Sequence, residues 1–486
     1  MQEIRWILLL EILYTLIVIG TCLRIVYETR SATKTLAYLM LTVFFPIVGI
    51  IIYFSIGTNY RKRKLYSKKI VKDVNMQLQI KESVIQESKK IWDTVPDDII
   101  KYKKLATLLL NDGMSFLSGY NKIEVLKNGE HKFTEVIKSL REAKHHIHIE
   151  YYIYEDDVIG NAIKDILIEK ARAGVQVRFI YDDFGSRSIR KKLVPELIAA
   201  GVQAFPFYKI LFIKLANRLN YRNHRKIIVI DGYIGYTGGI NVSDRYINSP
   251  KNTDQVFWRD THVKITGSGV QYLQYLFIGD WNFCAEEELA PTPEFFFDPE
   301  GEEGDSIVQI AASGPDSDNP TILFSIIQVI GMAEQEILIT TPYFIPGESL
   351  IDALVVAALS GVKVRLLVPD KSDSGFVAAA ARSYYNELMM AGIEIYQYEK
   401  GFVHAKTMVV DKQVSVIGTA NMDYRSFELN FEVNSVIYDS HVAREMADIF
   451  YDDLSDSCKI DPEDWSKRLL YKQLPEKLTR LVSPLL

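Results

Sequence analysis

One short pattern of chemically active residues occurs twice in this chain. A histidine is followed two residues later by a lysine and, after four further residues, by an aspartate. The two copies are His224, Lys226 and Asp231 in the first and His404, Lys406 and Asp411 in the second. A turn of small residues follows each copy and ends in an asparagine, which is Asn241 or Asn421. The matching offsets indicate one site that is built from two similar halves.

The residue types of this pattern suit chemistry on an anionic group such as a phosphate. Lysine supplies a positive charge, and a turn of small residues lets backbone amides approach an anion closely. Two histidines that face one phosphate can divide the work, because an ordinary imidazole pKa of about 6.5 suits both a nucleophile and a proton carrier. We therefore predict a covalent phosphohistidine on one histidine and acid/base catalysis by the other.

The residues of each motif are expected to point in two directions. A histidine and a lysine two positions apart on a strand share one face, whereas the aspartate points the other way. Asp231 and Asp411 belong to the site motif, but we expect them to end the strands and to bond turn amides or a distant cation. Aligning the two repeats offers Asp260 and Glu432 as partners that orient the second nitrogen of each histidine.

The elements around the two motifs repeat in the same order. Each half reads as strand, helix, strand, helix, strand and motif strand, beginning at 146–153 and at 337–345. Short β-branched strands that alternate with helices predict an α/β fold, and a glycine just past each helix predicts a C-cap. We expect two lobes, 105–290 and 319–486, that are joined by a linker over 291–318 and related by a pseudo-twofold axis.

The N-terminal sequence is apolar enough to enter a membrane. Residues 6–27 are apolar apart from two charged side chains, and residues 36–56 carry no charge. About 20 apolar residues span a bilayer as a helix, so we expect two transmembrane helices within 1–59, with a signal peptide as the alternative for the first. The basic residues at 61–64 place this flank on the cytoplasmic side, together with the lobes and, across an even number of spans, the N-terminus.

Two further segments flank the predicted lobes. Residues 60–104 are charged and have helical spacing, which predicts a helical connector. The basic cluster at its start either sets the topology alone or also binds anionic headgroups. The tail over 461–486 is predicted to form an amphipathic helix that packs on the lobes, with membrane contact as the less favoured alternative.

Composition narrows the choice of function. A chain of 486 residues is long enough for two or three domains. Its formal net charge of -6 gives no overall reason to bind nucleic acid. The three scattered cysteines form no disulfide framework or zinc spacing, which favours a reducing compartment.

Other chemically suggestive residues are given structural roles. His146, His148 and Glu150 share one strand face, as metal ligands would, but the second repeat has no equivalent set. We therefore expect core or cleft-wall positions for them rather than a metal site. Two aromatic pairs end strands near the predicted cleft and either fill the core or line the cleft, namely Tyr151 with Tyr152 and Tyr343 with Phe344.

The paired motifs resemble those of the phospholipase D superfamily, which is named for its His-Lys-Asp signature. The likeness covers essentially the whole chain and includes the segments Phe45–Gly49, Trp258–His262, Thr341–Phe344 and Asn421–Ser426. With an apolar hairpin in front, the chain is similar to the bacterial cardiolipin synthases of the phospholipase D type. This resemblance implies transfer of a phosphatidyl group from one phosphatidylglycerol to another, with release of glycerol, at a membrane of anionic phospholipids and without a metal.

The resemblance also implies a role for each matching residue. His224 corresponds to the nucleophile and His404 to the acid/base, while the paired lysines and asparagines listed above hold the phosphate. One departure is Thr419, which stands where the first repeat has Gly239 and makes the two half-sites inequivalent. Three alternatives stay open: a phospholipase or a synthase that uses another acceptor, a nuclease, and a membrane scaffold without activity.

Overall fold

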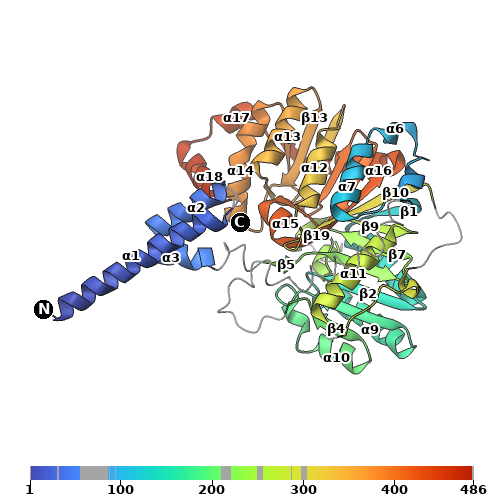
Figure 1. Cartoon of the computed structure of the whole chain (residues 1–486). Helices are drawn as coiled ribbons and strands as arrows, with labels where there is room; N and C mark the ends of the chain where they lie inside the picture. The colour runs from blue at the N-terminus through green and yellow to red at the C-terminus, as the bar shows by residue number, and fades with distance from the viewer. Residues whose placement is uncertain are drawn as a thin grey trace.

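One sheet runs through both halves of the α/β region in the computed structural model (Figure 1). The structure describes residues 2–29, 32–54, 86, 88–93, 95–208, 221–248, 255–285, 287–296 and 304–483. Within these residues the sheet has sixteen strands, of which fifteen follow one path and the short β5 (Arg222–Asn223) pairs beside it with β19 (Asn430–Tyr438). From its middle outward, the first half contains β1 (Ser118–Lys127), β9 (Thr261–Thr266), β7 (Ile234–Gly238), β6 (Lys226–Ile230), β2 (His146–Tyr151), β3 (Gln176–Tyr181) and β4 (Gln203–Pro206).

The second half of the sheet repeats this order in the opposite direction. From the middle outward it contains β10 (Ser306–Ser313), β19 (Asn430–Tyr438), β17 (Val414–Gly418), β16 (Thr407–Val410), β11 (Glu336–Thr340), β13 (Lys363–Pro369), β14 (Glu394–Tyr398) and β20 (Ser457–Lys459). The two halves correspond strand for strand up to β20, and β1 pairs antiparallel with β10 at the centre. This arrangement confirms the two α/β lobes and the pseudo-twofold symmetry that the repeat predicted.

Helices cover both faces of the sheet in each lobe. One face carries α8 (Asn128–Glu142), α9 (Val158–Arg172), α10 (Leu193–Ala199), α12 (Thr321–Ile330), α13 (Glu348–Leu359) and α14 (Gly375–Met390). The other face carries α11 (Val270–Cys284) and α16 (Ser440–Ser455). The outer strands of each lobe are parallel, and most of their residues are buried or half-buried between the two layers of helices. The predicted C-caps are present as left-handed glycines at Gly174, Gly201, Gly361 and Gly392.

Two predicted domain boundaries differ from the structure. The linker predicted over 291–318 contains β10, which lies at the centre of the sheet and pairs with both β1 and β19. The helices α6 (Asp97–Ile100) and α7 (Lys103–Gly113) pack in the core of the second lobe, whereas the prediction places 97–104 in the connector and 105–113 in the first lobe. The residues on both sides of β10 are acidic or turn-forming and indicate a linker, whereas nearly all residues of β10 itself are buried.

The apolar N-terminus differs from the predicted pair of spans. It forms α1 (Gln2–Glu28), α2 (Ala32–Phe44) and α3 (Pro46–Ile52). Among the described residues, one helix is long and apolar enough to cross a membrane, and it covers Trp6–Glu28. The expected single helix over 36–56 is interrupted at Phe45, which has φ -134° and ψ 67°. Pro46 causes this break, because a proline ring disfavours helical geometry in the residue before it.

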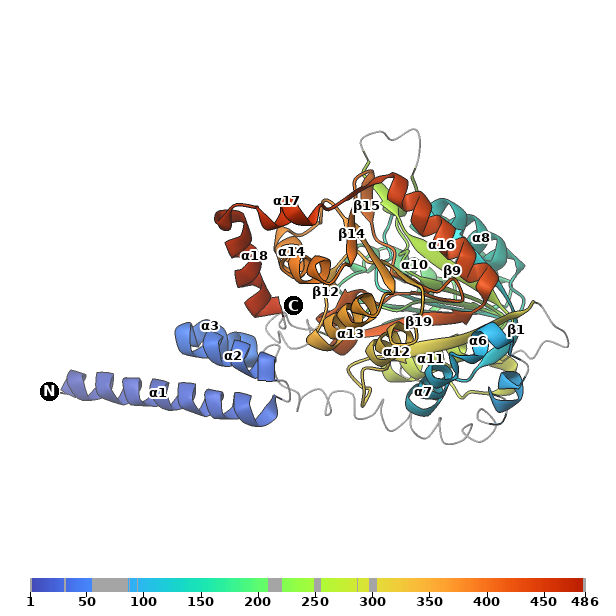
Figure 2. The ribbon, with the colours of Figure 1, turned by 90° about the horizontal axis from the view of Figure 1, so that it is seen from above.

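After the break, α3 folds back along α2 instead of continuing it. The rings of Tyr38 and Tyr53 lie 5.5 Å apart, although fourteen residues separate them in sequence. A Cβ atom on Gly49 would lie 2.4 Å from the Thr42 Cα atom, so only glycine permits this close approach. Figures 1 and 2 show the resulting α2–α3 hairpin beside the C-terminal part of α1.

The α2–α3 hairpin is attached to the second lobe. Lys34 on α2 forms an ion pair with Glu428, and its ammonium lies 5.6 Å from the centre of the Tyr424 ring. Both partners belong to α15 (Tyr424–Glu428). The predicted basic cluster and most of the predicted connector lie outside the described residues. The predicted tail forms α17 (Pro462–Ser466) and α18 (Leu470–Val482), of which α18 packs on α14.

Candidate active site

Two short ladders between the lobes position the motif histidines. β5 (Arg222–Asn223) pairs with the start of β19, and the backbone N–H of His224 donates to the carbonyl of Phe431 over 3.0 Å. β15 (Gly401–Val403) pairs with β8 (Phe257–Arg259), and the N–H of His404 donates to the carbonyl of Arg259 over 2.7 Å. Each histidine therefore sits just before its motif strand, beside a segment of the other lobe.

These ladders pair each histidine with a carboxylate of the opposite lobe. His224 Nδ1 lies 2.9 Å from Glu432 Oε2, and His404 Nδ1 lies 2.8 Å from Asp260 Oδ2. The carboxylate side chains are 0–1% exposed, whereas the histidine side chains keep 12% and 10% of their surface. Because a carboxylate accepts from Nδ1–H, it leaves Nε2 of each ring with a lone pair on the open side.

The motif lysines lie beneath the histidines rather than in the open cleft. Lys226 Nζ donates to the His224 carbonyl over 2.8 Å, and Lys406 Nζ donates to the His404 carbonyl over 2.5 Å. Burial lowers the pKa of Lys226 to about 7 and that of Lys406 to about 8. Each lysine thus fixes its histidine segment and places a cationic group directly under it.

Both histidines are neutral at pH 7 in the absence of a ligand. Burial, together with the neighbouring Lys226, lowers the pKa of His224 to about 4 against the opposite effect of Glu432. Burial and the Lys406 ammonium lower the pKa of His404 to about 3. A bound anion would raise the pKa of both histidines, since negative charge nearby favours the protonated imidazole.

The motif aspartates lie away from the histidines, at the far ends of the strands. The Asp231 carboxylate accepts the backbone N–H groups of residues 144–146, and the Asp411 carboxylate accepts those of residues 334–336. Asp411 also forms an ion pair with Lys101 over 3.0 Å. Both aspartates have left-handed φ values, 53° and 52°. These contacts hold the turns that enter β2 and β11, and neither aspartate touches the reacting groups.

One cavity of about 490 Å³ collects the functional side chains of both lobes. Its lining includes His224, His404, Asn241 and Asn421. The Asn241 amide group donates to the Tyr246 hydroxyl over 2.7 Å, so it supports the wall in this state. The buried Oδ1 of Asn421 has no hydrogen-bond partner among the described residues.

The aromatic pairs divide between the core and the cavity. Tyr152 and Tyr343 line the cavity, whereas Tyr151 and Phe344 are buried in the cores of their lobes. The Tyr152 ring lies 4.9 Å from the His224 ring at 63° and walls one side of it. Adjacent residues on a strand point to opposite faces, so each pair supplies one residue to each environment.

Three arginines in the cavity lining were missed by sequence reasoning. They are Arg222, Arg245 and Arg425. Guanidinium groups bind phosphate oxygens in a bidentate geometry, so these side chains suit a phosphodiester. Asp373 and Asp423 also line the cavity, and Arg245 pairs with Glu155. A signal was available for Arg425, which lies within the Asn421–Ser426 segment, and for Arg222, which lies two residues before His224.

The two half-sites differ where Thr419 replaces Gly239. A Cβ atom on Gly239 would lie 2.0 Å from Asp260 Oδ1, so the glycine makes room for this carboxylate. Thr419 instead donates its hydroxyl to Glu432 Oε2 over 2.6 Å. Burial raises the pKa of Glu432, but His224, Lys226 and this hydroxyl together lower it more, which keeps the carboxylate ionised.

A second layer supports the segment that carries His224. The Asn223 amide donates to Glu150, and Arg225 forms a buried ion pair with Asp280. Glu150 thus lies behind the cavity wall. His146 and His148 share a hydrogen-bond partner, Gln274, within the same buried layer.

One family model matches this chain twice. The family described as "Cardiolipin synthase, PLD-like domain" matches residues 136–273 and 326–454. A second family, "Phospholipase_D-nuclease N-terminal", matches residues 13–57. The two matched copies of the first family cover both lobes and both motifs.

Curated relatives extend this match to nearly the whole chain. Cardiolipin synthase 2 of Bacillus cereus is 42% identical over 94% of this chain and 88% of the relative. The major cardiolipin synthase ClsA of Bacillus subtilis is 38% identical over 99% of both chains. Phosphatidylserine synthase of Haemophilus influenzae shares the fold, with a TM-score of 0.58 and 16% identity over 79% of this chain and 100% of its own. The chain therefore belongs to the cardiolipin synthase family of phospholipase D-like phosphatidyltransferases.

Proposed function

We propose that this enzyme transfers a phosphatidyl group from one phosphatidylglycerol to a glycerol hydroxyl of another, through a phosphatidyl-histidine intermediate. One observation supports this scheme most directly. Two histidines from different lobes line one cavity, and each has its Nδ1 on a buried carboxylate. This arrangement leaves two Nε2 atoms for a single phosphate, one for attack and one for proton transfer.

In the first step, Nε2 of His224 attacks phosphorus and forms a P–N bond. The P–O bond to the headgroup glycerol breaks, and His404 gives its proton to the departing oxygen. Glu432 stabilises the positive charge that develops on the His224 ring, as a hydrogen-bonded carboxylate does for an imidazolium.

In the second step, a glycerol hydroxyl of another phosphatidylglycerol enters the cavity. Neutral His404 removes its proton, the oxygen attacks phosphorus, and the P–N bond breaks. The products are cardiolipin, glycerol and the original His224. One phosphodiester replaces another, so the scheme needs no nucleotide and works in both directions.

The first step requires protonated His404, although its pKa is about 3 in the ligand-free protein. Substrate binding raises this pKa, because a phosphodiester brings a negative charge next to His404. Substrate binding would thus protonate the acid while the nucleophile attacks.

The cavity lies beside the apolar hairpin, which suits a lipid substrate. Tyr424 and Arg425 line the cavity, and Tyr424 also contacts Lys34 on α2. We infer a membrane location with the lobes on the cytoplasmic side, following the basic flank at 61–64. Because α3 folds back along α2, we infer one span by α1 in place of two, which puts the N-terminus on the opposite side from the lobes.

Purified enzyme in phosphatidylglycerol vesicles tests the reaction. Cardiolipin and free glycerol should appear in equal amounts without CTP. Phosphatidic acid as the main product would instead show a phospholipase, and DNA cleavage would show a nuclease. His224→Ala and His404→Ala should each abolish turnover, whereas His441→Ala, on the exposed surface, should not. Full activity in either active-site variant would refute the two-histidine scheme.

Acid quenching during turnover tests the intermediate. A phosphatidyl adduct should be found by peptide mapping on the peptide that contains His224. An adduct on His404 would exchange the two roles, and absence of any adduct in wild-type enzyme under conditions of rapid turnover would favour direct displacement.

A further inference from the structure

The C-terminal helix α18 packs on the protein with its polar face. The residues that are buried or half-buried against the lobe lie at helical spacing and are Gln473, Glu476, Thr479, Arg480 and Ser483. Arg480 pairs with Glu387 on α14 over 2.9 Å. The Ser483 hydroxyl lies 2.8 Å from the Tyr384 hydroxyl, also on α14. Polar contacts therefore dock this helix.

The opposite face of α18 is apolar and faces away from the protein. It consists of Leu470, Tyr471, Leu474, Leu478 and Leu481, which are 54–80% exposed. A surface helix of a soluble domain normally turns such a stripe toward the core. Here the packing is reversed, so this face needs a partner outside the lobe.

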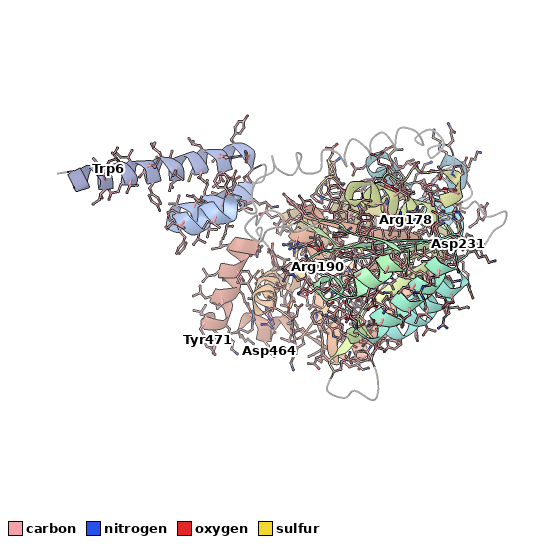
Figure 3. The ribbon with its side chains drawn as sticks, turned by 90° about the horizontal axis from the view of Figure 1, so that it is seen from below. Trp6, Arg178, Arg190, Asp231, Asp464 and Tyr471 are labelled. Carbon is pink, nitrogen blue, oxygen red and sulfur yellow. The ribbon has the colours of Figure 1, made fainter. Side chains whose placement is uncertain are left out.

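The position of α18 in the molecule indicates which partner this is. Figures 1 and 2 place α18 on the side of the lobes from which α1 projects, and Figure 2 shows the α2–α3 hairpin between α18 and α1. Figures 2 and 3 show α18 running across the direction of α1, with Tyr471 at the edge of the molecule. The C-terminal end of a span marks the boundary of the bilayer, where an interfacial helix lies in the membrane plane. Lys472 and Lys477 are exposed on the same helix and suit anionic headgroups.

We propose that the outward face of α18 lies in the surface of the bilayer that α1 enters, as a second membrane contact of the lobes. Together with the Lys34 contact to α15, this contact fixes two points of the second lobe against the lipid surface. α18 packs on α14, and Val377 of α14 lines the cavity. The helix would thereby hold the cavity at the depth of lipid headgroups. The proposal concerns membrane contact and does not depend on the reaction proposed above.

A fluorescent reporter tests this contact in the full chain. Cys22, Cys284 and Cys458 are replaced by alanine, and a single cysteine with an environment-sensitive dye is placed by Leu474→Cys. The matched control is Val158→Cys, an exposed apolar position at the start of α9 in the first lobe. In proteoliposomes that contain phosphatidylglycerol, brominated phospholipid should quench the dye at 474 and leave the dye at 158 unchanged. A dye at 474 that is unquenched would overturn the proposal, and a blue-shifted but unquenched dye would point to a protein partner.

Activity on two physical forms of one substrate gives a second test. The double variant Leu474→Asp, Leu478→Asp should lose most of its rate on phosphatidylglycerol vesicles. It should keep the wild-type rate on a short-chain phosphatidylglycerol that is dispersed as monomers. The control Val158→Asp should keep both rates. Equal losses on vesicles and monomers would show that the face serves the fold or the site, and would contradict membrane docking.

Discussion

Removal of the charge on Glu432 tests how the cavity divides the work between its histidines. Glu432 is fully buried and accepts hydrogen bonds from His224 Nδ1, over 2.9 Å, and from the Thr419 hydroxyl, over 2.6 Å. Glu432→Gln keeps the size of the side chain but removes the carboxylate that stabilises a positive His224 ring. The geometry of the segment should persist, because β5 and β19 still pair.

The magnitude follows from the loss of one charge-assisted hydrogen bond. Such a bond contributes roughly 1.5–3 kcal/mol. Because about 1.4 kcal/mol corresponds to a tenfold change in rate, kcat should fall roughly 10- to 150-fold. Glu445→Gln, on the exposed face of α16, changes the net charge equally and should have no effect.

The choice of substrate separates Glu432 from its counterpart Asp260. With phosphatidylglycerol, Glu432→Gln and Asp260→Asn should both be slow. With a phosphatidyl ester of nitrophenol, the leaving group needs no proton, so the first step no longer requires the acid that Asp260 orients. Asp260→Asn should then release a burst of nitrophenol in a stopped-flow assay, while Glu432→Gln should stay slow.

Two outcomes would refute this division of roles. Wild-type turnover in Glu432→Gln would mean that the carboxylate neither orients nor stabilises a reacting histidine. A burst in Glu432→Gln, with none in Asp260→Asn, would make His404 the nucleophile and His224 the acid.

Three further predictions concern stability and topology. Asp411→Ala leaves three backbone N–H groups and Lys101 without their carboxylate partner. The free energy of unfolding should fall by about 3 kcal/mol, and the melting temperature in detergent should be lower than that of the wild type. The pKa of His224 is about 4 in the fold and about 6.5 in the unfolded chain, so the unfolded state binds more protons between these pH values. The free energy of unfolding should therefore fall as the pH drops from about 6.5 to about 4. The variant His224→Asn should reduce this pH dependence in a series of melting temperatures. An N-terminal epitope tag should be digested by protease added to intact spheroplasts if α1 alone crosses the membrane, whereas protection of the tag would support two spans.

Local sequence patterns were enough to predict the lobes and the identity of the site. Strands such as β2 and β11 are short segments with recurring isoleucine or leucine residues that end at turns, and their periodicity is set by the backbone itself. The glycines after the helices were recognisable because few other residues adopt the left-handed conformation. The motif residues were recognisable because their chemical types recur at fixed offsets in both repeats.

Boundaries and membrane helices were predicted less well, for physical reasons. β10 lies among acidic and turn-forming residues, so its burial depends on strands from both lobes that a local window does not contain. The apolar stretch over 36–56 has the composition of a span, but Pro46 and Gly49 allow it to fold back on itself. Hydropathy measures how apolar a segment is, but it does not show where the chain reverses its direction.

Two copies of a His-Lys-Asp motif in a duplicated α/β fold could be recognised from the residue types and their spacing alone. The sequence also supplied Asp260 and Glu432 as partners for the histidines, since the repeats align there. The pairing of each carboxylate with the histidine of the other lobe depends on how the two lobes pack. The tertiary structure also decided that α18 turns its leucines outward. Such pairings join residues more than a hundred positions apart, and they arise when two lobes pack about a common axis, which no local pattern encodes.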